Sequence, residues 1–220
     1  MHRFGQWFPK ITLLFFTLIF LNSISASFAQ ETIVTSPDKV NLVDITSVNR
    51  KIRLDIRYAT TNNFLKKKVY PVERCLLRAS VAKQLLRVQA DLQKKGLGLK
   101  VYDCYRPLSV QKQMWAIMPD SNYVANPANG SRHNRGAAVD LTLVDSAGNE
   151  LEMPTEFDDF SDRAHRDYQG ASPKALQNRQ LLEDAMKNRG FIPLKSEWWH
   201  FDAPGWEKFP LLDVPLESIK

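Results

Sequence analysis

The sequence predicts an α+β domain in which helices flank a mainly antiparallel central sheet. Three observations predict this class: segments with strand-like alternation, two segments with helical spacing of apolar residues, and a turn that suits a hairpin. Helical and strand-like segments are interspersed, and the chain has no internal repeat or low-complexity segment. Its length of 220 residues is enough for a single domain with its own core.

Residues 1–29 have the pattern of a secretory signal. Arg3 and Lys10 precede an apolar run, and small residues end the segment at Ala29. The run is too short for a comfortable membrane span. Because no cysteine lies near the cleavage point, a lipoprotein anchor is not indicated. We expect a mature domain over 30–220, exported and periplasmic, with no stable membrane insertion after cleavage. An uncleaved N-terminal anchor is the alternative.

The charge and the cysteines limit the possible partners and the compartment. The formal net charge of +6 falls to +4 without the signal, which contains two basic residues and no acid. This mild, scattered excess argues against a nucleic-acid partner. The cluster Lys66-Lys67-Lys68 is interpreted as a solvated loop. Cys75 and Cys104 are expected to form a disulfide in an exported protein, with two buried thiols or a soft metal site as alternatives.

The first half of the domain is expected to place a long helix between two strands. A lead-in over 30–50 has an apolar stretch from Val40 to Val48. Ile52–Tyr58 alternates apolar and charged residues, as a half-buried strand does, and 60–73 is a loop. Apolar residues from Leu77 to Leu92 recur every three or four positions and predict a helix that Gly96 ends.

The elements that follow are expected in this order along the chain: a strand at 97–102, a short helix capped by Ser109 and ending near Met118, a loop over 119–135, a strand at 137–144, a turn at 145–149 with a partner strand at 151–153, a loop over 154–171, a helix from Pro173 to Asn188, and strands at 191–194 and 196–202. Ser172 before Pro173 suits the start of the last helix, and Gly190 suits its end.

The segment Ser131–Asp140 offers a pair of metal ligands. His133 and Asp140 are seven residues apart, and Gly136 between them permits a tight turn from the loop into a strand. On that strand Asp140 lies on the face opposite the apolar residues, so we expect it to face a cleft. The alternative is that Asp140 pairs with Arg135 or caps a turn.

The segment Glu197–His200 completes the set. His133, Asp140 and His200 supply two nitrogens and one oxygen, which suits Zn²⁺ and leaves a position for water. Glu197 is a second carboxylate that need not bind metal. Residues three apart fall on opposite faces of a strand, so either a bulge or a position of Glu197 before the strand is required. Trp198 and Trp199 are expected to wall the cleft, one of them being core.

Other roles are open for two of the histidines. His200 could be a satisfied core histidine. His165, in a polar stretch, is expected to be exposed or to support the site without binding metal.

These strings resemble a known family. Ser-x-His-x-x-Gly-x-Ala-x-Asp and Glu-x-x-His resemble zinc peptidases related to D,D-carboxypeptidases, lysostaphin and the hedgehog domain. The longer strings around Arg106, Asp140, Asp158 and His200 are similar to the VanX-like D-alanyl-D-alanine dipeptidases, over about residues 40–202. The resemblance implies zinc-dependent hydrolysis of the D-Ala-D-Ala dipeptide to two D-Ala, with one Zn²⁺ per chain, in cell-wall peptide turnover.

The resemblance also implies individual roles. His133, Asp140 and His200 would be the zinc ligands. Glu197 would be the general base, and Arg106 the cation that stabilises the developing oxyanion. The residues implied to bind substrate are Ser131, Asp158, which would receive the free amine, and Tyr58. Arg106 as a structural ion pair and Asp158 as a loop-capping residue are the alternatives.

Two features depart from the family. Arg132 stands where some members have a small residue, and it could contact the substrate carboxylate or turn outward. The signal also distinguishes this chain from the cytoplasmic resistance enzymes, so we expect a role in wall turnover or scavenging.

Two other functions stay open: a zinc D,D-carboxypeptidase or endopeptidase acting on longer peptidoglycan peptides, and a non-catalytic metal-stabilised binding module. A serine hydrolase is disfavoured because the chain has no Gly-x-Ser-x-Gly string.

Overall fold

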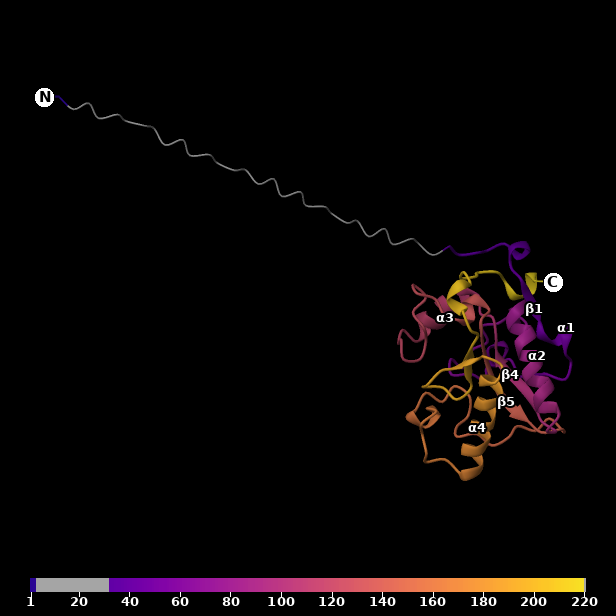
Figure 1. Cartoon of the computed structure of the whole chain (residues 1–220). Coiled ribbons are helices and arrows are strands. Elements are labelled where there is room, and N and C mark those ends of the chain that lie inside the picture. Colours follow the sequence, from indigo (N-terminus) through magenta and orange to yellow (C-terminus); the bar gives the residue numbers. More distant parts are fainter. Residues whose placement is uncertain (3–31, 220) are drawn as a thin grey trace. The chain divides into compact units, whose positions relative to one another are not determined.

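A five-stranded mixed sheet forms the centre of residues 32–219 (Figure 1). The structure, a computed structural model, describes these residues together with residues 1 and 2, so nearly all of the expected signal lies outside the described residues. Among the neighbouring strand pairs of this sheet, β2 and β4 run parallel and the other three pairs run antiparallel. The prediction of an α+β fold with a mainly antiparallel sheet is confirmed. The strands in spatial order are β2 (Arg53–Leu54), β4 (Gly98–Asp103), β5 (Ala138–Val144), β7 (His200–Asp202) and β6 (Ile192–Pro193).

Two long helices lie against this sheet, α2 (Ala79–Gln93) and α4 (Pro173–Lys187), and they also contact each other. The shorter helices are α1 (Ile45–Val48) and α3 (Leu108–Ile117). A separate two-stranded sheet pairs β1 (Leu42–Asp44) with β3 (Leu76–Arg78). Buried apolar residues of α2, β4 and β5 belong to one hydrophobic core.

The ends of the two long helices follow local sequence chemistry. The Ser172 hydroxyl accepts a hydrogen bond from the Ala175 amide at 3.1 Å, which satisfies a free N–H group at the start of α4. Gly96 after α2 and Gly190 after α4 have φ values of +72° and +85°, a conformation that glycine adopts without steric cost. Both helices were predicted with nearly these bounds.

Several boundaries differ from the prediction because distant segments decide them. Leu77 lies in β3 and not in the helix, since β3 pairs with β1. Ser109 lies inside α3, where its amide donates to the Asp213 carboxylate at 2.8 Å, so the expectation of a Ser109 cap is wrong. β2 contains only Arg53 and Leu54, and the chain turns into a short 3-10 helix at Arg57–Ala59.

The C-terminal strands are also shorter than expected. β7 begins at His200, so Glu197 lies before the strand and no bulge is needed. β6 contains Pro193, which the edge of a sheet tolerates because a proline there need not donate a hydrogen bond. In place of the expected strand at 151–153, Glu150 forms a single bridge with Val144.

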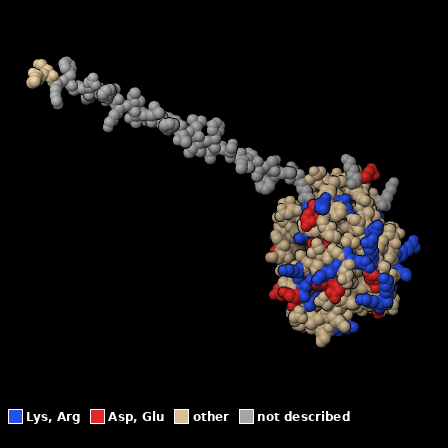
Figure 2. Space-filling view, viewed as in Figure 1, with Lys and Arg blue, Asp and Glu red and all other residues tan. Residues whose placement is uncertain are grey.

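The surface agrees with the modest charge balance. On the face seen in Figure 2, basic and acidic side chains are interspersed. Lys66, Lys67 and Lys68 are exposed, as expected for a solvated loop. Among the described residues, no helix combines the length and hydropathy that a membrane crossing requires.

Candidate metal centre

The sheet register brings two of the three expected ligands together. Asp140 on β5 and His200 on β7 are directly opposed across the antiparallel pair, where side chains on one face approach within about 5 Å. Asp140 Oδ1 lies 2.9 Å from Nδ1 of His200. The Asp140 carboxylate therefore contacts His200. The alternative was that Asp140 pairs with Arg135, and Arg135 donates to the Phe209 carbonyl oxygen.

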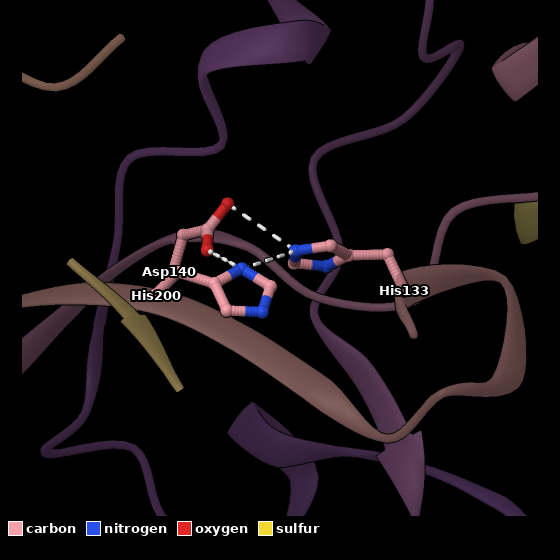
Figure 3. Close-up of side chains that lie close together, drawn as sticks. All are labelled: His133, Asp140 and His200. Atoms are coloured by element: carbon pink, nitrogen blue, oxygen red, sulfur yellow. Dashed lines mark hydrogen bonds and ion pairs between the residues drawn. The ribbon is translucent and has the colours of Figure 1, made fainter. Parts of the chain in front are cut away.

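His133 reaches the same point from the loop before β5 (Figure 3). Its Nε2 lies 3.2 Å from His200 Nδ1 and 3.4 Å from Asp140 Oδ2. One potential ligand atom from each of the three side chains lies within 4.8 Å of the others, and all three residues are buried. Gly136 makes this approach possible, because its φ of +65° turns the chain into β5.

Each imidazole is held by its other nitrogen. His133 Nδ1 lies 2.7 Å from the Cys104 carbonyl oxygen, which can only accept, so His133 donates a proton there. His200 Nε2 lies 2.8 Å from Asp202 Oδ1. In the neutral rings, the nitrogens that converge on Asp140 are then unprotonated, as metal binding requires.

The electrostatics of the three residues favour a cation. Burial by itself would lower the pKa of His200, but hydrogen bonds to Asp140 and Asp202 raise it to about 10. Burial would raise the pKa of Asp140, but His133 and His200 hold it below its ordinary value. In the metal-free cluster His200 therefore holds a second proton beside ionised Asp140. A divalent ion such as Zn²⁺ would bind in exchange for that proton, and the donor set suits it.

The three residues lie at a pocket of about 230 Å³. Every catalytic, metal-binding and substrate-binding residue singled out from the sequence lines it. These are Tyr58, Arg106, Ser131, His133, Asp140, Asp158, Glu197 and His200. His165 is not among them: its side chain is 39% exposed, and its Nε2 lies 3.8 Å from Asp162 Oδ1.

Glu197 borders the metal cluster without completing it. Its Oε2 lies 3.9 Å from Nδ1 of His200. Burial raises the pKa of Glu197 above its ordinary value, and the charge of Asp140 adds to the effect while His200 opposes it. Both following tryptophans are buried: Trp199 lines the pocket, whereas Trp198 lies away from it and donates to the Thr155 hydroxyl at 2.9 Å.

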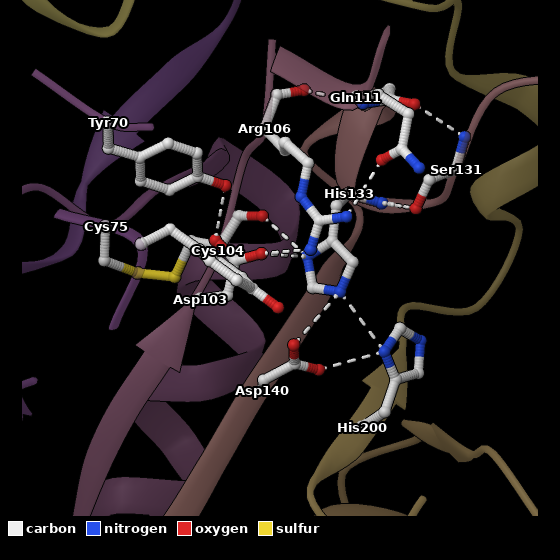
Figure 4. A network of polar contacts seen from close by, with 12 residues as sticks. Tyr70, Cys75, Asp103, Cys104, Arg106, Gln111, Ser131, His133, Asp140 and His200 are labelled. Atoms are coloured by element: carbon white, nitrogen blue, oxygen red, sulfur yellow. Dashed lines mark hydrogen bonds and ion pairs between the residues drawn. A yellow bond between two sulfur atoms is a disulfide. The ribbon is translucent and has the colours of Figure 1, made fainter. Parts of the chain in front are cut away.

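Arg106 presents a rigidly held cation to the pocket (Figure 4). Its two terminal nitrogens donate to Asp103 at 2.7 Å and to Gln111 at 2.9 Å, and its guanidinium lies 5.1 Å from the ring centroid of Tyr58. Burial would lower the pKa of Arg106, but Asp103 holds it well above its ordinary value. Its Nε atom is buried without a hydrogen-bond partner among the described residues.

Asp158 occupies another part of the pocket. It accepts hydrogen bonds from the Tyr58 hydroxyl at 3.1 Å and from the Phe64 amide at 3.3 Å. Burial, with the charge of Asp140 added, raises the pKa of Asp158 to about 7. Its φ of +65° is unusual for a residue other than glycine, although aspartate tolerates it better than most. Asp158 is therefore a buried carboxylate available to a cation.

A disulfide supports the cluster from behind. Cys75 and Cys104 are bonded, with their Cα atoms 5.2 Å apart. Cys104 is the residue whose carbonyl oxygen accepts from His133, and its neighbour Asp103 holds Arg106. The bond thus links the residue before β3 to the residue after β4, beside two residues of the pocket (Figure 4).

Sequence reasoning missed two carboxylates that hold site residues in place, Asp103 and Asp202. The contact of Asp202 with His200 could have been predicted from the sequence, because residues two apart on a strand share a face and Asp202 follows His200 by two positions. The contact of Asp103 with Arg106 could not, since it depends on how the chain turns after β4.

Comparisons with known proteins agree with this site. The peptidase M15 family model, described as D-ala-D-ala dipeptidase, matches residues 38–213. A D-alanyl-D-alanine dipeptidase of Escherichia coli (strain K12) is 38% identical over 175 residues, which cover 80% of this chain and 91% of that protein. One of Enterococcus faecium is 34% identical over 171 residues, covering 68% and 85%.

Solved structures are more distant. One described as VanYB in complex with D-Alanine-D-Alanine is 17% identical, covers 60% of this chain and 74% of that chain, and has a TM-score of 0.40. The match to the family model and the identity to the dipeptidases are far stronger. On these two findings, the chain belongs to the D-ala-D-ala dipeptidase family of zinc metallopeptidases.

Proposed function

We propose that this protein hydrolyses the dipeptide D-Ala-D-Ala to two D-Ala, with one Zn²⁺ per chain held by His133, Asp140 and His200. The observation that carries the proposal is the convergence of these three side chains on one point of a small pocket. The same pocket contains a separate carboxylate, Glu197, and a buried cation, Arg106. A purely structural zinc site has four protein ligands, and this cluster has three.

The zinc ligands fit the ion by donor type and by protonation. When bound, Zn²⁺ supplies Lewis-acid chemistry that polarises a carbonyl and makes hydroxide available near neutral pH. Cys104 and Asp202 accept the proton on the other nitrogen of His133 and of His200. The nitrogens that face Asp140 can then bind the metal once His200 has released its second proton. Asp140 brings a negative charge that offsets part of the charge of the metal.

Glu197 is proposed to act as the general base. A buried carboxylate with a raised pKa takes a proton from water more readily than one with an ordinary pKa. Its place beside His200 sets it next to the metal site without occupying it. The same carboxyl can then deliver the proton to the leaving amine.

Arg106 is proposed to stabilise the negative charge that develops on the carbonyl oxygen. Asp103 and Gln111 hold its guanidinium, so little reorganisation is needed when that charge appears. The buried and unpaired Nε atom shows that the hydrogen-bonding capacity of this side chain is not exhausted.

Asp158 is proposed to receive the free amine of the substrate, with the Tyr58 hydroxyl holding the carboxylate in place. The rings of Phe64 and Phe160, 5.2 Å apart, also line the pocket, and the Phe64 amide binds Asp158. An N-acylated substrate would leave Asp158 buried and unpaired against apolar rings, which is the physical basis for rejecting longer peptides. Ser131, at the pocket beside His133, is proposed to contact the substrate.

The decisive experiment compares two substrates. The purified protein is incubated with D-Ala-D-Ala and with N-acetyl-D-Ala-D-Ala, each with and without a chelator. We expect release of D-Ala from the free dipeptide only, its loss with the chelator and its recovery with zinc. Cleavage of the blocked substrate at a similar rate would instead identify a carboxypeptidase. Absence of cleavage with stoichiometric zinc bound would identify a binding module.

We also propose that the protein is exported to the periplasm, where it acts on dipeptides released during wall turnover. The pattern of residues 1–29 and the Cys75–Cys104 disulfide support this location, because disulfides persist in oxidising compartments. N-terminal sequencing of the protein from a periplasmic extract should read from Gln30. Recovery of the intact N-terminus from the cytosol would contradict the proposal.

A further inference from the structure

Asp202 is a buried carboxylate to which the proposed reaction assigns no role. It lies on β7 two residues after His200, and 5% of its surface is exposed. Its Oδ1 atom lies 2.8 Å from Nε2 of His200. Because the other nitrogen of His200 faces Asp140, the ring is held between two carboxylates, one at each nitrogen.

The contact selects which tautomer His200 adopts. A carboxylate can only accept, so Nε2 of His200 carries the proton and Nδ1 keeps the lone pair that faces Asp140 and His133. The same hydrogen bond fixes the rotation of the ring. In metal sites, such an outer carboxylate raises the basicity of the ligand nitrogen and orients it.

A second residue, Arg132, acts on Asp202 from the other side. The Nε atom of Arg132 lies 3.6 Å from Oδ2 of Asp202, the oxygen that does not bind His200. That Nε atom is buried and has no hydrogen bond among the described residues. The guanidinium lies 4.8 Å from the ring centroid of Trp206, within the range of a cation–π contact. Arg132 is thus held between an aromatic face and the Asp202 carboxylate.

The charges of these residues explain why Arg132 and Asp202 lie together. Asp140 and Asp202 are buried carboxylates on either side of one imidazole. An unpaired buried carboxylate is costly, and two close together repel each other. Arg132, at 3.6 Å, offsets part of the charge of Asp202.

We propose that Asp202 and Arg132 are positioning residues for the metal centre: Asp202 orients His200 as an Nδ1 ligand, and Arg132 holds Asp202. This inference rests on the proposed function only in taking His133, Asp140 and His200 as the zinc site. Arg132 also lines the pocket, and this inference assigns its charge to Asp202 and not to the substrate carboxylate.

The test measures zinc affinity without substrate. Dissociation constants are obtained by competition with a chromophoric chelator for the full mature protein and for Asp202→Ala, Asp202→Asn, Arg132→Met and the double variant Asp202→Ala/Arg132→Met. We expect Asp202→Ala to weaken zinc binding by about 10- to 100-fold. Asp202→Asn should recover part of this loss, because an amide oxygen can still accept from His200.

Arg132→Met keeps an unbranched side chain over Trp206 but removes the charge. We expect it to weaken zinc binding by less than Asp202→Ala does, and to add nothing in the double variant, because Arg132 acts through Asp202. Asp162→Ala is the matched control, since it removes the partner of His165, a histidine outside the cluster. It should bind zinc like the unaltered protein. Urea unfolding of each metal-free variant establishes that it is folded.

Three results would overturn the inference. Unchanged zinc affinity in folded Asp202→Ala and Asp202→Asn would remove the role of Asp202. Losses of zinc affinity that are fully additive in the double variant would show that Arg132 does not act through Asp202. A higher KM for D-Ala-D-Ala in Arg132→Met with unchanged zinc affinity would assign Arg132 to the substrate. Failure of the proposed function is distinct, because the unaltered protein would then bind zinc without cleaving D-Ala-D-Ala.

Discussion

Asp140 and Asp158 are two buried carboxylates of one pocket whose pKa values are displaced in opposite directions. Two imidazoles hold the pKa of Asp140 below its ordinary value. Burial, with the charge of Asp140 added, raises the pKa of Asp158 to about 7. Two residues of the same type thus differ in charge state: Asp140 is an anion beside the two imidazoles, and Asp158 titrates near neutral pH.

The titration of Asp158 predicts a pH dependence of substrate use. The ammonium group of D-Ala-D-Ala requires ionised Asp158, which predominates only above about pH 7. We therefore expect kcat/KM to fall as the pH drops below about 7. In Asp158→Asn, kcat/KM should be lower and the limb should lose the part due to Asp158, leaving only the part set by Glu197, whose pKa is also raised. Steady-state kinetics from pH 5 to 8 measure it, and an unchanged limb in the variant would contradict the assignment.

The same residue predicts a cost in stability. Because the pKa of Asp158 is raised by folding, its contribution to stability is fully present below its unfolded pKa and is lost as the pH rises through about 7. Asp158→Asn should therefore raise the free energy of unfolding by a few kcal/mol at pH 8 and have little effect near pH 4. Urea unfolding of the metal-free proteins at both pH values tests the sign.

Glu197 is expected to matter for turnover and not for metal binding. Its carboxylate is 3.9 Å from Nδ1 of His200 and is not one of the three converging ligands. Glu197→Gln should lower kcat by about 10²- to 10⁴-fold, the usual contribution of a general base, while one zinc per chain stays bound. Metal analysis beside the kinetics distinguishes the two effects. Glu207→Gln, at an exposed position, serves as the control.

At the scale of elements, the turn before β5 decides whether His133 from the loop and Asp140 from the strand meet. Gly136 separates His133 from Asp140, with a φ of +65°. A Cβ atom there would lie 2.6 Å from Cδ2 of Leu42, whose side chain is packed in the core. The turn therefore tolerates a side chain poorly for two reasons, conformation and space.

Gly136→Ala should lower the free energy of unfolding by roughly 2–3 kcal/mol, of which about 1–2 kcal/mol is the left-handed conformation. It should also weaken zinc binding, because Leu42 and the turn must move apart. Gly96→Ala is the matched control: its φ is +72°, but nothing lies within 4 Å of the added atom. Urea unfolding should show a smaller loss for Gly96→Ala, and equal losses would mean that the contact with Leu42 is relieved at no cost.

The elements differ in how far their own residues determine them. α4 could be predicted closely, since Ser172, Pro173 and Gly190 mark its ends locally. β1 and β3 could not, because three residues each form a strand only by pairing across more than 30 positions. β7 was expected to start at Ser196, but pairing with β5 begins only at His200. Local signals are reliable where the stabilising contacts are local.

At the scale of the whole molecule, the disulfide is expected to affect both the stability of the fold and the position of His133. Cys75 and Cys104 close a loop with a separation of 29 residues. Replacing both by Ala should lower the free energy of unfolding by about 3–4 kcal/mol, because the unfolded chain gains freedom. Zinc affinity should fall as well, since the Cys104 carbonyl orients His133. Unaltered protein treated with a reductant should match the double variant, and unchanged unfolding in both would contradict the prediction.

The residue types and their spacing by themselves determined the chemistry of this protein. The sequence indicated a metallopeptidase from specific strings that contain two imidazoles, several carboxylates and an arginine. Few other residues in the chain could perform hydrolysis. Only the tertiary structure decided how these groups are arranged. The register that opposes Asp140 to His200, the burial that raises the pKa of Asp158, and the contact of Arg132 with Asp202 all join segments far apart in sequence. Their geometry depends on long-range pairing, which no local pattern of residues encodes.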